Sequence, residues 1–240
     1  MDLIIFDKDG VLLNLTKTWL PVAIDITHLL SKLTEYEYAP DVFQSIIGIS
    51  EKTGTIDPDG LFAAGTFLDQ QAACLAKAPA LKAHFEDPSY RESVMEIVKR
   101  NGQRGPVPHG DIETSLRQLK SDGFKLAILT NDSHGSATNA MARLGVTDYF
   151  EMIVGFDSGY GGKPAPQGYH AICEACGIDA SRSIMVGDTG ADVNVAAAAG
   201  AGLFVGISEL YPHPTKALAN SKHILPSIEG LSPLLNGILR

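Results

Sequence analysis

The sequence predicts an α/β protein whose parallel sheet is flanked by helices and carries a small helical domain inserted after the first strand. From about residue 104 onward, short apolar runs alternate with helix-like segments, as in βαβ units. Residues 15–99 contain helical segments without clear strands. Several apolar runs end in polar residues, as expected where a parallel sheet binds a ligand. We therefore expect a Rossmann-like core of residues 1–14 and 100–240, with residues 15–99 as an α-helical cap.

The composition favours a small-molecule task. The 240 residues are 45% hydrophobic and 20% charged, and the net charge is -9. Nucleic acid or an anionic membrane would require a basic face, so neither is expected as a partner. No signal peptide or membrane-length apolar run is visible, so the cytoplasm is the expected location. We expect a monomer or a homodimer. Cys173 and Cys176 form a C-x-x-C pattern inside a predicted helix, and we expect no zinc or redox role for them.

Helical spacing of apolar residues predicts the elements of the insert. The first helix includes Trp19, which we expect in the core, and runs to about residue 33. A second helix covers residues 41–47, and residues 48–60 are rich in Gly, Thr, Asp and Pro and predict turns and loop. We expect one helix over residues 61–77 and another over 88–99, with a proline at its start.

The remaining core elements follow in alternation. We expect helices over residues 111–121, 136–144, 166–176 and 192–199, and a short final helix. The apolar runs at residues 124–129, 150–155, 183–186 and 202–205 predict strands. With the opening strand, the sheet should have five or six strands.

The opening strand ends in two carboxylates, Asp7 and Asp9, followed by Gly10. The turn that glycine permits would allow both carboxylates to reach one pocket. Two converging carboxylates suit a divalent cation, or a nucleophile with an acid/base partner. Taken alone, the pattern is equally compatible with an ordinary turn. Lys8, between the acids, faces either solvent or the carboxylates, and the sequence assigns it no role.

Other polar residues are predicted at the same edge of the sheet. Thr130 and Asn131 end a second strand, and Lys163 lies in a glycine- and proline-rich loop. Asp188 and Asp192 follow a third strand. Carboxylates from different strands suit Mg²⁺, whereas a hydroxyl, backbone N–H groups and a lysine suit a phosphoryl group. Because no Walker loop is present, the pattern favours metal-assisted phosphoryl chemistry other than that of P-loop enzymes.

Four motifs in this order resemble those of the haloacid dehalogenase (HAD) superfamily. D-x-D-G-[TV] corresponds to residues 7–11, and a strand ending in Thr corresponds to residues 129–131. The motif lysine corresponds to Lys163 in Gly-Lys-Pro-x-Pro, and G-D-x-x-x-D to residues 187–192. The Pro-His-Gly at residues 108–110 and the helical insert are similar to the phosphoglycolate phosphatase and β-phosphoglucomutase branch.

The resemblance implies a Mg²⁺-dependent phosphatase that acts on a small phosphate ester such as phosphoglycolate or a sugar phosphate. It implies that Asp7 is the nucleophile, forming an aspartyl-phosphate, and that Asp9 is the acid and base. The implied metal ligands are Asp7, the backbone carbonyl of Asp9, Asp188 and Asp192, the last as a ligand or an orienting residue. The implied phosphate-binding residues are Thr130, Asn131 and Lys163. A carboxylate at position 9 favours phosphate esters over carbon–chlorine bonds.

Two alternatives remain open at this point: a phosphosugar mutase of the β-phosphoglucomutase type, and a non-catalytic regulator that binds phosphometabolites. Substrate specificity is expected in the cap, because such lids exclude water and contact the leaving group. The candidates are Lys52, Thr53, Thr55, Gly65, Thr66 and, in the core, His134. The simpler interpretation, which we prefer, is a solvated Lys52 and a Gly65–Thr66 pair that permits close helix packing.

Overall fold

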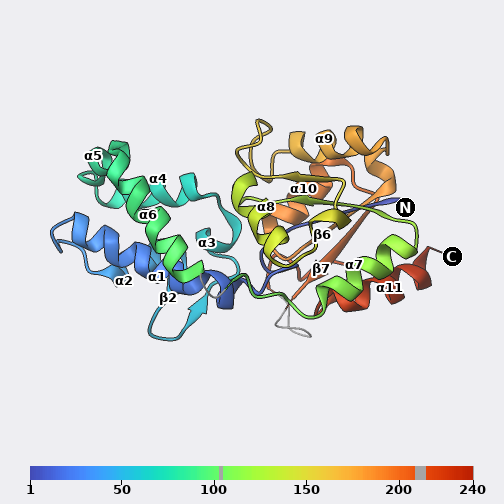
Figure 1. The fold of residues 1–240 in the computed structure, drawn as a ribbon, viewed down its shortest axis with the longest axis horizontal. Helices are drawn as coiled ribbons and strands as arrows, with labels where there is room; N and C mark the ends of the chain where they lie inside the picture. Colours follow the sequence, from blue (N-terminus) through green and yellow to red (C-terminus); the bar gives the residue numbers. More distant parts are fainter. Residues whose placement is uncertain (103–104, 209–214, 240) are drawn as a thin grey trace. The chain divides into compact units, whose positions relative to one another are not determined.

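The computed structural model describes residues 1–102, 105–208 and 215–239. The chain divides into two compact units, shown as ribbons in Figure 1. The core unit comprises Met1–Asn14 and Val107–Arg240, and the helical unit comprises Leu15–Pro106. The helical unit therefore extends to Pro106, beyond the expected residue 99, and its last helix continues to Asn101.

A six-stranded parallel sheet forms the centre of the core unit, in the order β5-β4-β1-β6-β7-β8. The strands are β1 (Leu3–Phe6), β4 (Lys125–Leu129), β5 (Met152–Val154), β6 (Ser183–Gly187), β7 (Leu203–Ile207) and β8 (Ile224–Leu225). β1 is buried along its whole length and lies between β4 and β6. The predicted Rossmann-like α/β fold is confirmed, and the first strand is central.

Helices cover both faces of this sheet (Figure 1). Ile4 and Phe6 of β1 pack in one cluster with residues of α7 (Ile112–Ser121), α8 (His134–Arg143) and α11 (Leu231–Ile238). Leu3 and Ile5 pack in a second cluster with residues of α9 (Gln167–Cys176) and α10 (Gly190–Ala199). Successive side chains of a strand point to opposite faces, so the apolar run of β1 supplies both cores.

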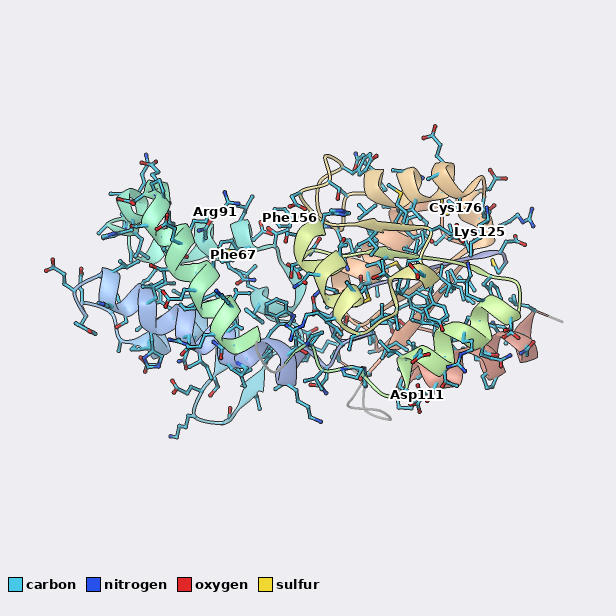
Figure 2. The ribbon with its side chains drawn as sticks, viewed as in Figure 1. Phe67, Arg91, Asp111, Lys125, Phe156 and Cys176 are labelled. Atoms are coloured by element: carbon cyan, nitrogen blue, oxygen red, sulfur yellow. The ribbon has the colours of Figure 1, made fainter. Side chains whose placement is uncertain are left out.

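Polar contacts fix the ends of these helices. The side chains of Asp111 and Ser133 cap the N-termini of α7 and α8. At the C-terminus of α9, the ammonium of Lys125 donates a hydrogen bond to the carbonyl of Cys176 at 2.7 Å (Figure 2). A cation is favourable there because the last helix carbonyls lack partners within the helix. Short 3-10 turns, η2 (Thr147–Tyr149), η3 (Ala180–Arg182) and η4 (Ile228–Gly230), complete the connections.

The helical unit has its own apolar core, which includes Leu20, Phe43 and Leu81. Its helices are α1 (Leu15–Leu33), α2 (Pro40–Ile47), α3 (Leu61–Ala64), α4 (Phe67–Lys77), α5 (Leu81–Glu86) and α6 (Pro88–Asn101). A short antiparallel hairpin joins β2 (Ile49–Ser50) to β3 (Thr55–Ile56). Within the described ranges, no helix is long and apolar enough to cross a membrane.

Four details of the insert differ from the prediction. The predicted loop over residues 48–60 contains the β2–β3 hairpin, which Gly48 permits by ending α2 at a φ of 82°. The predicted helix over residues 61–77 is interrupted, because Thr66 leaves the helical conformation and caps α4. Helix α5 was not predicted. Trp19, expected in the core, is partly buried on α1.

Candidate active site

The order of the strands brings three polar strand ends together. In the central part of the sheet, Phe6 pairs with Ile128 on one side and with Val186 on the other. The next residues along these strands include Asp7, Thr130 and Asp188, at the carboxyl edge of three adjacent strands. The sheet therefore places these three residues at one edge, where parallel sheets bind ligands.

A buried lysine joins two of the carboxylates. Lys163 Nζ lies 2.9 Å from Asp7 Oδ2 and 2.6 Å from Asp192 Oδ1, and Lys163 is only 6% exposed. Burial alone would lower the pKa of this lysine, but the charges of Asp192 and Asp7 raise it above its usual value. Lys163 is therefore a fixed positive charge beside Asp7.

Asp192 is held by protein groups through both carboxylate oxygens. Its Oδ1 accepts from Lys163 at 2.6 Å, and its Oδ2 accepts from the Thr189 backbone and hydroxyl at 2.9 and 2.7 Å. Oδ2 also accepts from the backbone N–H of Asp188 at 3.2 Å. The contact with the Thr189 backbone N–H is part of a capping box at the start of α10. Of the two roles considered for Asp192, this arrangement favours orienting Lys163 and the Asp188 turn over direct metal ligation.

Asp7, Asp188 and Asp192 form a group in which one carboxylate oxygen from each lies within 4.8 Å of the others. Asp188 Oδ1 is buried and has no hydrogen-bond partner among the described residues. Burial and the charges of Asp7 and Asp192 raise the pKa of Asp188 well above its usual value. An oxygen-rich site with an unpartnered carboxylate oxygen fits a hard cation such as Mg²⁺.

Asp7 is 5% exposed and accepts hydrogen bonds on both oxygens. The backbone N–H of Lys8 donates to Oδ1 at 2.6 Å, and Lys163 contacts Oδ2. Burial raises the pKa of Asp7 to about 7, with Lys163 opposing and Asp192 adding to this effect. A bound cation would favour the ionised form that a nucleophile requires.

Gly10 allows the turn after Asp9 to approach the third strand end. It has a φ of 78°, in the left-handed region, and a side chain at this position would collide with the carboxylate of Asp188. The ring of His109 lies 3.1 Å from the carbonyl oxygen of Gly10, measured from Nδ1. His109 therefore contacts the same turn from the start of the second chain segment of the core unit.

Asp9 forms an ion pair that was not predicted. Lys8 Nζ lies 2.6 Å from Asp9 Oδ2 and 2.9 Å from Asp132 Oδ2, and the Lys8 side chain is 0% exposed. Burial would lower the pKa of Lys8, but Asp9 and Asp132 raise it above its usual value. Of the two orientations considered for Lys8, the structure has the one that faces a carboxylate. Alternation beyond Phe6 was the available signal, because it assigns Lys8 to the α8 face of the sheet.

The second strand end supplies a hydroxyl and an amide. Thr130 is 2% exposed, and its hydroxyl accepts from the backbone N–H of Asp132 at 3.2 Å. The side chain of Asn131 binds the backbone of Lys163 twice, accepting from its N–H at 2.7 Å and donating to its carbonyl at 3.1 Å. Asn131 thereby fixes the loop that presents Lys163.

The specificity candidates occupy other environments. Lys52, Thr53 and Thr55 are exposed in the β2–β3 hairpin, where the two threonine hydroxyls lie 2.7 Å apart. Gly65 and Thr66 form the break between α3 and α4.

His134 begins α8, and its Nδ1 lies 3.1 Å from the carbonyl oxygen of Ile153. Its backbone N–H donates to Asp157 Oδ1 at 2.7 Å. These contacts account for His134 as a residue that fixes the start of α8.

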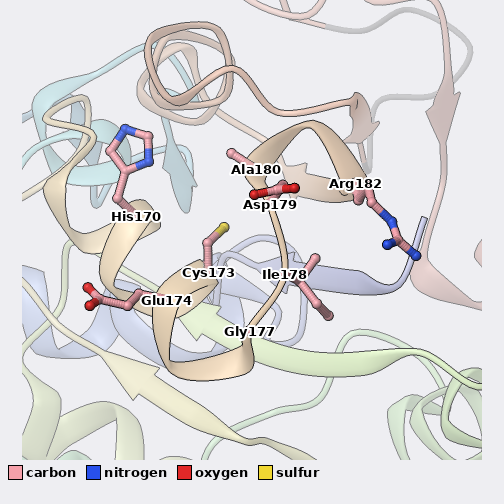
Figure 3. A pocket seen from close by; sticks show the side chains of 8 residues that line it. All are labelled: His170, Cys173, Glu174, Gly177, Ile178, Asp179, Ala180 and Arg182. Atoms are coloured by element: carbon pink, nitrogen blue, oxygen red, sulfur yellow. The ribbon is translucent and has the colours of Figure 1, made fainter.

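A separate pocket of about 390 Å³ lies at the C-terminal half of α9 (Figure 3). Its lining includes His170, Cys173 and Arg182, and none of the predicted site residues. Cys173 is 6% exposed, and burial raises the pKa of its thiol. These properties indicate a thiol of low reactivity rather than a second active site.

Comparison with known proteins finds relatives that agree with the family resemblance of the four motifs. A family model described as haloacid dehalogenase-like hydrolase matches residues 1–200. The phosphoglycolate phosphatase of Aquifex aeolicus is 29% identical over 204 residues, which cover 83% of this chain and 82% of that protein.

Two solved structures share the fold. The HAD phosphatase of Thermococcus onnurineus has a TM-score of 0.71 at 21% identity, with 99% of each chain covered. The β-phosphoglucomutase of Clostridium difficile has a TM-score of 0.68 at 17% identity, with 100% of each chain covered. The match of the family model confirms the resemblance inferred from the four motifs. The chain belongs to the haloacid dehalogenase-like hydrolase family.

Proposed function

We propose that this protein is a Mg²⁺-dependent phosphatase that hydrolyses a small phosphorylated metabolite through an aspartyl-phosphate on Asp7. The observation that carries the proposal is the environment of Asp7. Its carboxylate directly follows the central strand, contacts Lys163 at 2.9 Å and groups with the carboxylate of Asp188. Asp188 Oδ1 has no hydrogen-bond partner among the described residues. This combination suits a nucleophile that must approach an anionic phosphate.

In the first step, an Asp7 oxygen forms a bond to phosphorus while the bond to the leaving oxygen breaks. The carboxyl group of Asp9 gives its proton to that leaving oxygen. In the second step, Asp9 takes a proton from water, which attacks phosphorus and releases inorganic phosphate from Asp7. Two displacements thereby replace one harder displacement.

The remaining residues hold and orient the reacting groups. Lys163, the Thr130 hydroxyl and the backbone N–H of Asn131 would bind the phosphoryl oxygens, because the Asn131 side chain is engaged with the Lys163 backbone. Asp7, the carbonyl of Asp9 and Asp188 would hold Mg²⁺, which when bound lowers the repulsion between nucleophile and substrate. Asp192 would orient Lys163 and the turn at Asp188.

The names of the relatives support a substrate class for this proposal. The Aquifex aeolicus relative is named a phosphoglycolate phosphatase, which supports phosphoglycolate or a sugar phosphate as substrate. We propose that the helical unit acts as the lid that selects among such esters, with Lys52, Thr53 and Thr55 of the hairpin as the first candidates. A panel of phosphorylated metabolites with Mg²⁺, measured by released phosphate, would identify the substrate.

The likeness to β-phosphoglucomutase is a likeness of fold alone. On the family resemblance, a mutase would use the same core residues as a phosphatase, so the reaction product has to separate them. Incubation with a hexose 1-phosphate separates the two reactions, since a phosphatase releases free phosphate whereas a mutase yields the 6-phosphate. We expect free phosphate. A non-catalytic regulator would turn over no member of the panel.

The nucleophile is tested by replacing Asp7 with Asn. We expect hydrolysis of p-nitrophenyl phosphate to fall by at least about 10³-fold, because the amide cannot attack phosphorus. Unchanged circular dichroism would show that the fold is retained, and Asp59→Asn, at an exposed acid, serves as the matched control. Normal turnover by the Asp7 variant would refute the assignment.

A further inference from the structure

The ammonium of Lys8 is enclosed between two carboxylates on one side of the sheet. Its side chain is 0% exposed, whereas those of Asp9 and Asp132 are 17% and 23% exposed. Nζ lies 2.6 Å from Asp9 Oδ2 and 2.9 Å from Asp132 Oδ2. Removing an ammonium from water is costly unless carboxylates compensate for the lost hydration, so the position of Lys8 depends on both partners.

Asp132 is itself fixed. Its second oxygen, Oδ1, accepts a hydrogen bond from the backbone N–H of Ser133 at 2.7 Å, next to the start of α8. Its own backbone N–H donates to the Thr130 hydroxyl at 3.2 Å. Lys8 therefore links Asp9, after β1, to a carboxylate anchored just after β4.

The two carboxylates that follow β1 are each paired with a buried lysine. Asp7 pairs with Lys163, whose other partner is Asp192 on the α10 side of the sheet. Asp9 pairs with Lys8, whose other partner is Asp132 on the α8 side. In both cases a lysine is fixed by one carboxylate and holds another. The first group acts on the nucleophile, which suggests an equivalent task for the second.

We propose that Lys8, anchored by Asp132, is a positioning residue that holds the Asp9 carboxyl group in place for proton transfer. This inference rests on the proposed phosphatase function. Asp9 needs such support because it precedes Gly10, whose φ of 78° begins a turn, and because its side chain is partly exposed. Proton transfer to the leaving oxygen requires hydrogen-bond contact, which a carboxyl group free to rotate into solvent makes only part of the time.

Two substrates whose leaving groups differ in their need for a proton distinguish a positioning role of Lys8 from a purely structural one. The phenolate of dinitrophenyl phosphate leaves without a proton, whereas an alkoxide such as that of a glycerol phosphate needs one. In the Lys8→Met variant we expect kcat/KM to fall about 10- to 100-fold for the alkyl ester and less than about 3-fold for the dinitrophenyl ester. We choose kcat/KM because it reports the steps up to departure of the leaving group. An equal fall for both esters would overturn the proposal.

A double variant tests whether Lys8 acts through Asp9. In an Asp9→Asn background, adding Lys8→Met should change the ratio of the two kcat/KM values by less than about 2-fold, because no proton donor remains to be positioned. A further large change in that ratio would contradict the inference. Lys125→Met, the same substitution at the opposite end of the adjacent strand, is the matched control and should leave the ratio unchanged.

Lys8→Met leaves two carboxylates without their shared cation and can impair folding. Lys8→Met combined with Asp132→Leu replaces the Lys8–Asp132 ion pair by apolar groups and leaves Asp9 without its lysine partner. The same dependence on leaving group is expected for this protein, and its absence would overturn the proposal. Failure of the wild-type protein to hydrolyse either ester would instead refute the phosphatase function, which keeps the two failures distinguishable.

Discussion

Asp188 is a residue whose charge is unfavourable without a cation. Its Oδ1 is buried without a hydrogen-bond partner among the described residues, and burial with the charges of Asp7 and Asp192 raises its pKa. A buried charge of this kind lowers the stability of the metal-free protein, but it provides a ligand for a cation. Removing the charge should therefore raise the free energy of unfolding of the metal-free protein.

Replacing Asp188 with Asn should stabilise the metal-free protein. At pH 8 we expect the free energy of unfolding to rise by roughly 1–2 kcal/mol, because the amide has no charge to desolvate or to repel Asp7. The increase in Tm on adding Mg²⁺ should be lost, since the proposed ligand is gone. Thermal and urea denaturation with and without Mg²⁺ measure both effects. A variant that keeps the Mg²⁺ response would exclude Asp188 as a ligand.

The positions of some site residues could be predicted from the sequence, whereas the environment of others could not. Asp7, Thr130 and Asp188 directly follow apolar runs, so their positions at strand ends could be predicted from pattern alone. For Lys8, alternation gives the face of the sheet but not the burial, because a lysine beside a turn is usually exposed. Its burial depends on Asp132, which is brought near only when β1 pairs with β4.

At the scale of elements, the break between α3 and α4 illustrates competition between periodicity and capping. Apolar spacing continues across residues 61–77 and predicts one helix, but Thr66 and Asp69 form a capping box. Thr66 Oγ1 accepts from the Asp69 backbone at 3.2 Å, and Asp69 Oδ2 accepts from the Thr66 backbone at 2.8 Å. Two satisfied backbone donors favour a new helix start over a continuous helix.

This capping box gives a prediction for a specificity candidate. Thr66→Ala and Asp69→Ala should each lower the free energy of unfolding by about 1 kcal/mol, because each leaves a helix donor without its partner. Thr66→Ser, which keeps the hydroxyl, should lower it much less. The relative kcat/KM values on a phosphate panel should stay the same in all three variants. A change in substrate preference with Thr66→Ala but not with Asp69→Ala would assign Thr66 to substrate binding.

The shortest strands could not be predicted from the alternation of apolar and polar residues. β2, β3 and β8 have two residues each, too few to show an alternation of apolar and polar side chains. Their pairing comes from backbone contacts set by the fold, such as the hydrogen bond from the Ser208 N–H to the Leu225 carbonyl at 2.9 Å. In contrast, β1 and β6 are buried along their whole length and could be predicted as continuous apolar runs.

For the whole molecule, the excess of negative charge opposes the binding of an anionic substrate. The chain has a net charge of -9, and the proposed substrate is also an anion. Lys163 supplies local positive charge beside three carboxylates. The excess of negative charge in the metal-free site means that folding and ionisation of the site are coupled.

This coupling predicts that the metal-free protein becomes less stable as the pH rises. Burial raises the pKa of Asp7 from 3.8 to about 7, and the pKa of Asp188 is raised in the same direction. Between pH 3.8 and about 7, Asp7 is protonated in the folded protein but ionised in the unfolded chain. The stabilisation that this proton gives is full below pH 3.8, falls as the pH rises and is lost once the pH passes about 7. For Asp7 alone the difference is on the order of 4 kcal/mol.

Urea denaturation between pH 5.5 and 8, with EDTA present, measures this slope. Surface acids whose pKa is lowered, such as Asp87 and Asp111, are already ionised in this window and add nothing to it. We expect the free energy of unfolding to fall with rising pH in EDTA, and to fall much less in Mg²⁺, because the cation favours the ionised carboxylates. Asp7→Asn should flatten the slope in EDTA. A stability that instead increases with pH in EDTA would mean that the carboxylates at the end of the central strand are already ionised without a cation.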